Sequence, residues 1–195
     1  MPAAHVQARR RPRVRRIVLA MAGTAAAWAM SCAFAAAPEY QLKAVFLFQF
    51  SQFVEWPSTA FAQDDAPFTV CVLGEDPFKQ YLDDAVRGEK VDGRPFAVKR
   101  LQRVEQVADC HILFIAQASP QRLDPILDAL RGRSILTVAD SAAFAERGGV
   151  IEFVTARNRL RLRINPRAAR AADLTISSKL LSLASLVPAG PEPAP

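Results

Sequence analysis

The chain has 195 residues, of which 51% are hydrophobic, and its formal net charge of +6 arises from 25 basic and 19 acidic side chains. Six arginines and no acidic residue lie within residues 1–35, so the remaining chain holds 19 basic and 19 acidic residues and is formally neutral. This balance excludes a general electrostatic argument for nucleic-acid binding, because the positive excess belongs to the first 35 residues.

Residues 1–35 have the order of a secretory signal peptide. An arginine-rich start precedes the apolar stretch IVLAMAGTAAAWAM, which the small-residue triplet Ala33-Phe34-Ala35 follows. The apolar part is short for a membrane-spanning helix, so we expect residues 1–35 to be cleaved on export. An uncleaved anchor and a lipoprotein lipidated at Cys32 are the alternatives, although Ala-Met-Ser before Cys32 lacks the usual leucine. The pair Arg15-Arg16 also leaves twin-arginine export open.

Residues 40–57, YQLKAVFLFQFSQFVEWP, predict an aromatic-rich helix that stops at Trp56-Pro57. A helical period places one broad apolar arc toward the core: Leu42, Phe46, Leu47, Phe50, Phe53 and Val54. The other side mixes polar and large apolar groups, and its candidate partner-binding residues are Phe48, Gln52, Glu55 and Trp56. Burial of Phe48 and Trp56 within the monomer is the open alternative.

Short apolar runs then alternate with amphipathic segments. Strands are predicted at residues 68–74, 95–101, 111–116 and 134–140, with helices after Asp76-Pro77 and Ser119-Pro120. The runs VIEFVTA and RLRLRIN, separated by Arg157-Asn158, predict an antiparallel hairpin, and Asn165-Pro166 caps a predicted long last helix.

This order predicts an α/β fold: a three-layer sandwich with a mostly parallel central sheet, a C-terminal antiparallel hairpin and helices on both faces. The domain is expected to span residues 36–187, and the tail 188–195, PAGPEPAP, is expected to be disordered.

Two cysteines remain beyond the predicted leader, Cys71 and Cys110. Because an exported protein meets an oxidising compartment, we expect them to form a disulfide, which requires the strands at 68–74 and 111–116 to lie close together. Two buried free thiols are the alternative.

Catalytic groups are scarce in the sequence. His111 is the single histidine beyond residue 35, and no Gly-x-Ser-x-Gly motif is present, so a metal site or a serine-histidine-acid triad is not predicted. Gly74 follows a strand in the manner of a phosphate-binding turn, but Glu75 and Asp76 would repel a phosphate and favour an ordinary turn. We therefore expect a protein that is not an enzyme, without catalytic residues, metal or cofactor.

The strand RLRLRIN separates basic from apolar side chains by its alternation. Its polar face consists of the candidate ligand-binding or partner-binding residues Arg159, Arg161, Arg163 and Asn165. A solvated edge strand, in which charge discourages aggregation, is the alternative.

Taken in order, the motifs FVEWP, FTVCVLGEDPF, GRPFAVKRL, ADCHILFIA, SILTVADSAAFAERGGVIEFV, RLRLRIN and LTISSKLLSLA resemble the YfiR family of exported bacterial proteins from about Glu39 to Val187. The resemblance implies a periplasmic regulator that binds the periplasmic part of a membrane-anchored diguanylate cyclase and holds it inactive. It further implies an outer-membrane lipoprotein that sequesters the regulator, control of cyclic di-GMP and biofilm, and a homodimer. Cys71 and Cys110 match the positions of a family disulfide. A periplasmic small-molecule sensor coupled to a histidine kinase or another membrane receptor is the second hypothesis.

Overall fold

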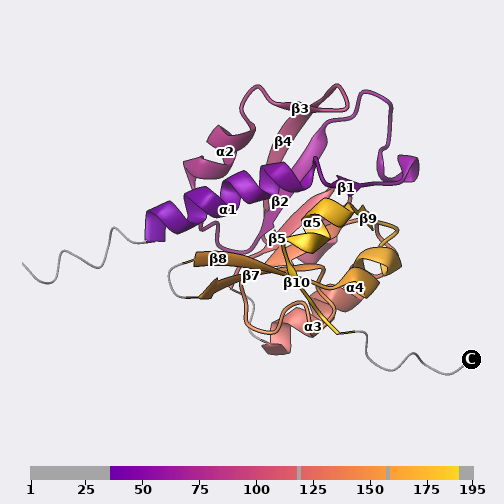
Figure 1. The fold of residues 1–195 in the computed structure, drawn as a ribbon. Coiled ribbons are helices and arrows are strands. Elements are labelled where there is room, and N and C mark those ends of the chain that lie inside the picture. Colours follow the sequence, from indigo (N-terminus) through magenta and orange to yellow (C-terminus); the bar gives the residue numbers. More distant parts are fainter. Residues whose placement is uncertain (1–35, 118–119, 157–158, 189–195) are drawn as a thin grey trace, which may run out of the picture. The chain divides into compact units, whose positions relative to one another are not determined.

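A computed structural model describes residues 36–117, 120–156 and 159–188 (Figure 1). The predicted signal peptide and residues 189–195 of the predicted tail lie outside the described residues. The described strands form an eight-stranded sheet and a two-stranded one. The large sheet contains β2 (Phe68–Leu73), β3 (Lys90–Val91), β4 (Arg94–Leu101), β5 (Ile112–Ile115), β6 (Leu136–Ala139), β7 (Ile151–Ala156), β8 (Arg159–Ile164) and β10 (Ser185–Leu186).

The strands of the large sheet lie in the order β10-β8-β7-β6-β5-β2-β4-β3. β4, β2, β5, β6 and β7 are parallel neighbours, and β8 returns antiparallel to β7 as the predicted hairpin. The chain leaves β2 toward one edge, through β4, and then crosses back to β5 on the other side. A reversal of this kind puts a topological switch point between β2 and β5, where many α/β proteins bind ligands. The mostly parallel sheet with its terminal hairpin confirms the predicted architecture.

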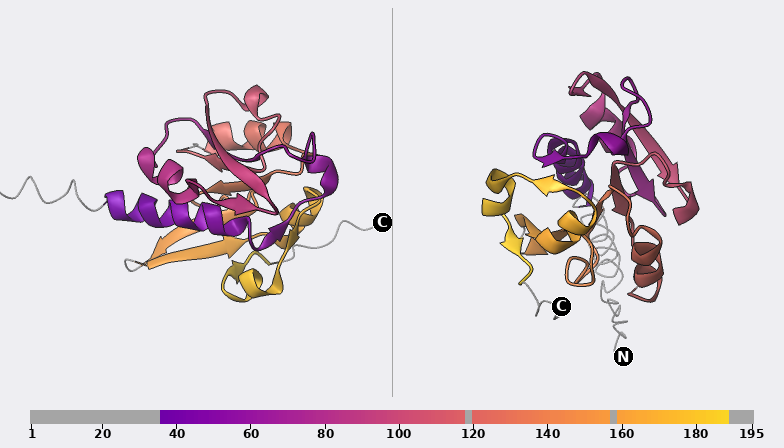
Figure 2. Two further views of the ribbon diagram at one scale, coloured as in Figure 1. Left: turned by 90° about the horizontal axis from the view of Figure 1, so that it is seen from above. Right: turned by 90° about the vertical axis from the view of Figure 1, so that its right-hand side faces the viewer.

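Helices cover both faces of the sheet, as predicted, and Figure 2 shows α3 on the side opposite α1. The helices are α1 (Ala36–Phe50), α2 (Gln80–Val86), α3 (Pro120–Ala129), α4 (Pro166–Ala171) and α5 (Ser178–Ser182), with single 3₁₀ turns at Ser58–Ala60 and Val104–Gln106. Residues of α1, α2, α4 and α5 share one buried cluster, and α3 packs in a second cluster on the other face.

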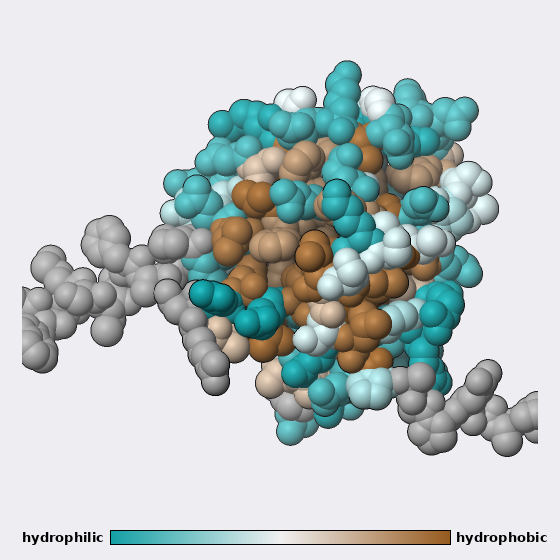
Figure 3. Space-filling view, viewed as in Figure 1, coloured by the Kyte–Doolittle hydropathy of each residue, from teal (hydrophilic) through white to brown (hydrophobic). Residues whose placement is uncertain are grey.

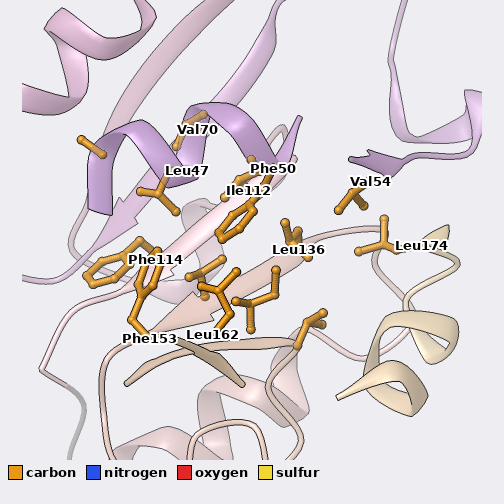
Figure 4. Packing of buried hydrophobic residues seen from close by; sticks show 14 of the residues in the cluster. Leu47, Phe50, Val54, Val70, Ile112, Phe114, Leu136, Phe153, Leu162 and Leu174 are labelled. Atoms are coloured by element: carbon orange, nitrogen blue, oxygen red, sulfur yellow. The ribbon is translucent and has the colours of Figure 1, made fainter. Parts of the chain in front are cut away.

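The larger cluster fills the space between α1 and the sheet. Leu47 and Phe50 of α1 lie over Phe114, Phe153 and Leu162 from the strands (Figure 4), and all of these side chains are 5% exposed or less. Phe50 stacks on Phe153 with ring centroids 5.9 Å apart. Because a fully buried Leu or Phe contributes about 1.5–3 kcal/mol, this contact holds α1 firmly on the sheet.

Cys71 and Cys110 form a disulfide, as predicted, with their Cα atoms 5.8 Å apart. Cys71 lies in β2, and Cys110 precedes β5, the neighbouring strand. Both belong to the cluster on the α3 face, so the bond lies in the core.

The sequence predicted an aromatic helix that continues to Trp56-Pro57, and this prediction is wrong. α1 ends at Phe50, where the Ser51 hydroxyl donates to the Phe48 carbonyl at 2.7 Å. Val54–Glu55 instead forms strand β1, paired antiparallel with β9 (Thr175–Ile176). Pairing with a segment 120 residues away therefore overrides the local helical pattern.

The predicted long last helix is also wrong. Asn165 caps α4 as expected, accepting at Oδ1 from the N–H groups of Arg167 and Ala168. The helix stops at Ala171, β9 follows, and Ser177 caps the separate helix α5. Asp173 has a positive φ of 55°, a backbone conformation that a continuous α-helix excludes. The β-branched pair Thr175-Ile176 suits the strand that takes its place.

Candidate partner-binding surface

The two aromatic candidates of the first segment have extensive contacts within the monomer. Phe48 is half-buried, and its ring centroid lies 5.4 Å from that of Phe96. Trp56 packs edge-on against Phe68 at 4.8 Å and donates its indole N–H to the His111 carbonyl at 3.2 Å. Both rings belong to an aromatic cluster that joins the end of α1 to the first residues of β2 and β4. Their other two companions, Gln52 and Glu55, are exposed.

The polar face predicted for residues 159–165 divides into an inward pair, Arg163 and Asn165, and an outward pair, Arg159 and Arg161. Arg163 lies 3.1 Å from Glu146 and 3.4 Å from Glu152, whose side chain is 4% exposed. Asn165 caps α4 and donates its amide to the Ala145 carbonyl at 2.8 Å. These two side chains stabilise the loop before β7 and the turn into α4.

Arg159 and Arg161 are the outward pair. Both are exposed, and neither has an ion-pair partner within the part of the chain that the structure describes. They border a groove of about 340 Å³ between α1, β8 and α5. Its other lining residues are Phe46, Gln49, Phe50, Phe53, Leu160, Leu162, Leu180 and Leu183. The groove thus combines an apolar floor with a cationic rim.

Several large apolar side chains of α1, of β10 and of the residue after α5 face solvent. Leu42 is 46% exposed, Val45 39%, Leu186 50% and Leu183 76%. Figure 3 shows apolar residues gathered on this face over α1, α5 and β10. A contiguous apolar region bordered by charge is typical of a protein-binding surface rather than of a solvated face. The prediction that Leu42 faces the core is wrong, because Leu42 is exposed and its neighbour Lys43 is buried instead.

Lys43 forms a buried polar network at the carboxyl edge of the sheet. Its Nζ lies 2.6 Å from Oδ2 of Asp140, directly after β6, and 2.8 Å from Oε1 of Glu39. The Tyr40 hydroxyl donates to the same Asp140 oxygen at 3.0 Å, and Thr155 donates to Glu39. The hydrogen bond from Lys43 lowers the pKa of Glu39. Burial, together with the Asp140 carboxylate, raises the pKa of Tyr40.

The switch point between β2 and β5 is packed by protein. A Cβ at Gly74 would lie 3.4 Å from the Ala116 carbonyl, and Gly74 has a φ of +98°, so this turn requires glycine. Asp76 accepts from the Phe78 N–H at 2.7 Å and pairs with Arg100 at 2.9 Å. Its carboxylate is thus occupied, which agrees with the expectation of an ordinary turn rather than a phosphate site.

His111 is buried between two aromatic rings. Phe61 and Phe68 stack on it with centroids at 4.5 and 4.8 Å, and its Nδ1 accepts from the Thr69 N–H at 3.0 Å. This bond requires the neutral ring with the proton on Nε2. Burial lowers the pKa of His111 to about 4, and the Ala60 backbone offsets this only in part. The environment is that of a core side chain.

A second, wider groove of about 1120 Å³ lies between α3, the loop at 146–150 and α4. Both charges occur along it, including Arg131, Arg133 and Asp128, and Arg131 pairs with Asp128 at 2.7 Å. Among the described residues there is no cluster of three or more His, Cys, Asp or Glu suited to a metal ion. The helices of that part also include none that could cross a bilayer.

Sequence reasoning assigned Phe46 and Phe53 to the core alone, and it did not single out α5. In the structure these two half-buried rings line the groove together with Leu160, Arg161 and Leu183, the residue that follows α5. The basic strand was the one available signal, because its alternation indicated a basic side next to an apolar side.

The profile of a protein family described as YfiR/HmsC-like matches residues 40–185. A solved structure described as the ABC domain in complex with L-Trp from Streptococcus pneumonia is 11% identical, with a TM-score of 0.50. The similarity covers 76% of this chain and 60% of that chain, and at this identity it concerns the fold alone. No curated protein matches the sequence.

Proposed function

The chain belongs to the YfiR/HmsC-like family, and on that premise we propose that it binds the periplasmic part of a membrane-anchored diguanylate cyclase and represses it. Members of this family are periplasmic regulators rather than enzymes, and membership suggests a role in cyclic di-GMP signalling. Repression of this kind needs no bond-making. It needs tighter binding to the inactive conformation of the cyclase than to the active one, and the shift cannot exceed that difference in affinity.

The observation that supports this function is the groove between α1, β8 and α5 with its cationic rim. It offers exposed apolar side chains and two arginines without ion-pair partners among the described residues, whereas most polar groups at the carboxyl edge of the sheet have protein partners. Gln52 and Glu55, which follow α1 in the chain, extend the proposed surface. Phe48 and Trp56 are half-buried and pack instead toward Phe96 of β4 and Phe68 of β2.

Three further elements complete the proposal. Residues 1–35 direct export and are removed, so that the mature protein acts in the periplasm. An outer-membrane lipoprotein sequesters the regulator by competing for the same surface, which raises cyclic di-GMP and promotes biofilm. The mature protein is a homodimer whose interface leaves this surface accessible.

The experiment is to delete the gene, measure cellular cyclic di-GMP, and complement with the wild-type chain or with a chain that lacks residues 1–35. Repression predicts a rise on deletion, a return with the wild type, and no return with the unexported chain. Unchanged cyclic di-GMP on deletion would reject the function.

A periplasmic small-molecule sensor coupled to a histidine kinase is a second candidate, favoured by the wide groove between α3 and α4. Thermal-shift screening of the mature protein with amino acids and nucleotides tests it. A saturable rise in Tm that Arg133→Ala removes would support this candidate.

A further inference from the structure

Among the described residues, no strand covers most of the outer edge of β8. β7 pairs with all of Arg159–Ile164, whereas β10 pairs only with Arg163 and Ile164. On the side away from β7, no strand of the described chain pairs with Arg159–Leu162. An unpaired edge of this kind presents its N–H and C=O groups as a template for another strand.

The direction of these backbone groups follows from the neighbouring contacts. The Val187 N–H donates to the Ile164 carbonyl at 2.8 Å, so Ile164 directs its backbone groups away from β7. In an antiparallel pair, residues two apart direct these groups to the same side. The N–H and C=O of Leu160 and the N–H of Leu162 therefore face the open edge, whereas the Leu162 carbonyl faces β10, because Arg163 is paired in parallel with Ser185.

The groove lies beside this same edge. Leu162 is buried and Leu160 half-buried on the face that α1 covers, and Phe46, Phe53 and Leu183 line the groove above them. An added strand would place alternate side chains among these apolar groups. Its other side chains would lie on the opposite face, beside the arginines of β8.

The charge pattern decides what kind of strand fits. In a second copy paired across a two-fold axis, Arg161 would lie opposite Arg161 or Arg159 of the other copy, and like charges directly opposite are destabilising. A segment with acidic residues at alternate positions would instead place carboxylates opposite Arg159 and Arg161. Apolar residues at the remaining positions would complete the groove.

We infer that the open edge of β8 binds an extended segment of a partner protein as an added strand, with acidic side chains facing Arg159 and Arg161 and apolar side chains in the groove. This rests on the proposed function for the identity of the partner, which would be the cyclase. At about 3.3 Å per residue, the four open residues span about 13 Å, so the paired part of the segment is short. Main-chain hydrogen bonds provide affinity, and the alternating side chains provide selectivity.

Synthetic peptides test the inference directly. The mature chain, residues 36–195, is titrated with the fluorescent peptide EVEVEV, with EEEVVV of the same composition, and with two EVEVEV versions N-methylated at alternate nitrogens. Strand addition predicts saturable binding of EVEVEV and at least about tenfold weaker binding of EEEVVV. One methylated version should lose binding and the other keep it. Equal binding of both methylated versions, or of EEEVVV, would overturn the inference.

Charge variants separate this edge from the rest of the surface. Arg159→Glu/Arg161→Glu should weaken EVEVEV about tenfold and favour KVKVKV. The control Arg103→Glu/Arg122→Glu changes the net charge equally at exposed positions outside both grooves, and should leave binding unchanged. Light scattering tests whether a second copy occupies the edge. If the wild type and the control are dimers and Arg159→Glu/Arg161→Glu is a monomer, a second copy occupies the edge and the inference fails.

Competition distinguishes the two proposals. EVEVEV binding without any binding of the cyclase segment would reject the proposed function and retain the edge. Cyclase binding that saturating EVEVEV does not displace would retain the function and reject this edge as its site.

Discussion

Lys43 of α1 and Asp140 at the end of β6 form an ion pair in which the ammonium group is almost fully buried, with Nζ 2.6 Å from Oδ2 and the lysine side chain 3% exposed. The pair fixes the start of the aromatic helix to the carboxyl edge of the sheet. Through Leu42, Val45 and Phe46, it also fixes which face of α1 is turned toward the groove.

Asp140→Asn should therefore lower the free energy of unfolding by about 2–3 kcal/mol, because it leaves a buried ammonium group with Glu39 alone. Lys43→Met/Asp140→Asn should recover most of this loss, since replacing both charges of a buried pair is often nearly neutral. Urea unfolding measures both. Asp128→Asn, in an exposed pair with Arg131, is the control and should change stability by less than about 1 kcal/mol. Equal losses in the two single variants would contradict the buried role of Lys43.

The disulfide joins Cys71 and Cys110, which lie 39 residues apart in the sequence. In the chain-entropy model, closing such a loop stabilises the fold by about 4 kcal/mol. Cys71→Ala/Cys110→Ala should lose about this amount in urea unfolding, and reductant should destabilise the wild type but not the variant. Alkylation of the native protein without reductant should label neither cysteine. Two labelled cysteines would show free thiols instead.

His111 should make stability depend on pH in the acidic range. Its folded pKa of about 4 lies below the ordinary 6.5, so the unfolded chain binds a proton that the folded chain does not. The contribution of His111 to the free energy of unfolding should be fully present above pH 6.5 and should fall as the pH drops from 6.5 to 4. Below pH 4 the protein should have lost about 3 kcal/mol. His111→Asn offers an acceptor for the Thr69 N–H and should remove that part of the slope in thermal unfolding between pH 4 and 7. An unchanged slope would show that other groups cause it.

The candidate partner-binding residues within residues 40–57 should differ in how much their substitution lowers the free energy of unfolding. Trp56→Ala should cost about 3 kcal/mol, because it removes the packing against Phe68 and the indole bond to the His111 carbonyl. Gln52→Ala/Glu55→Ala should stay within about 0.5 kcal/mol of the wild type, since both residues are exposed. Any rise in cyclic di-GMP with the second variant would thus report lost contact rather than lost folding. With Trp56→Ala, protein abundance must be measured in parallel.

Local patterns in the sequence predicted the architecture where structure is local. The alternation of RLRLRIN identified β8, and its apolar residues do face the core. Asn165 was recognised as a cap, and the contiguous apolar run Ile112–Ile115 was expected to form a central strand.

The errors concern contacts between distant segments. The helical period assigned Leu42 to the core, but the buried residue is Lys43, whose carboxylate partner Asp140 lies 97 residues away. The end of α1 depends on pairing between β1 and β9, which no local signal reveals. The groove likewise needs α1, β8 and α5 together, so Phe46 and Phe53 could not be recognised as lining residues from their helical positions.

The central claim is that Arg159, Arg161 and the groove beside them bind the cyclase. The most direct test is isothermal titration of the mature protein with the purified periplasmic segment of a membrane-anchored diguanylate cyclase from the same cell. The wild type and Arg103→Glu/Arg122→Glu should bind with equal Kd, and Arg159→Glu/Arg161→Glu should bind at least about tenfold more weakly. Equal binding by all three proteins, or none by the wild type, would contradict the account.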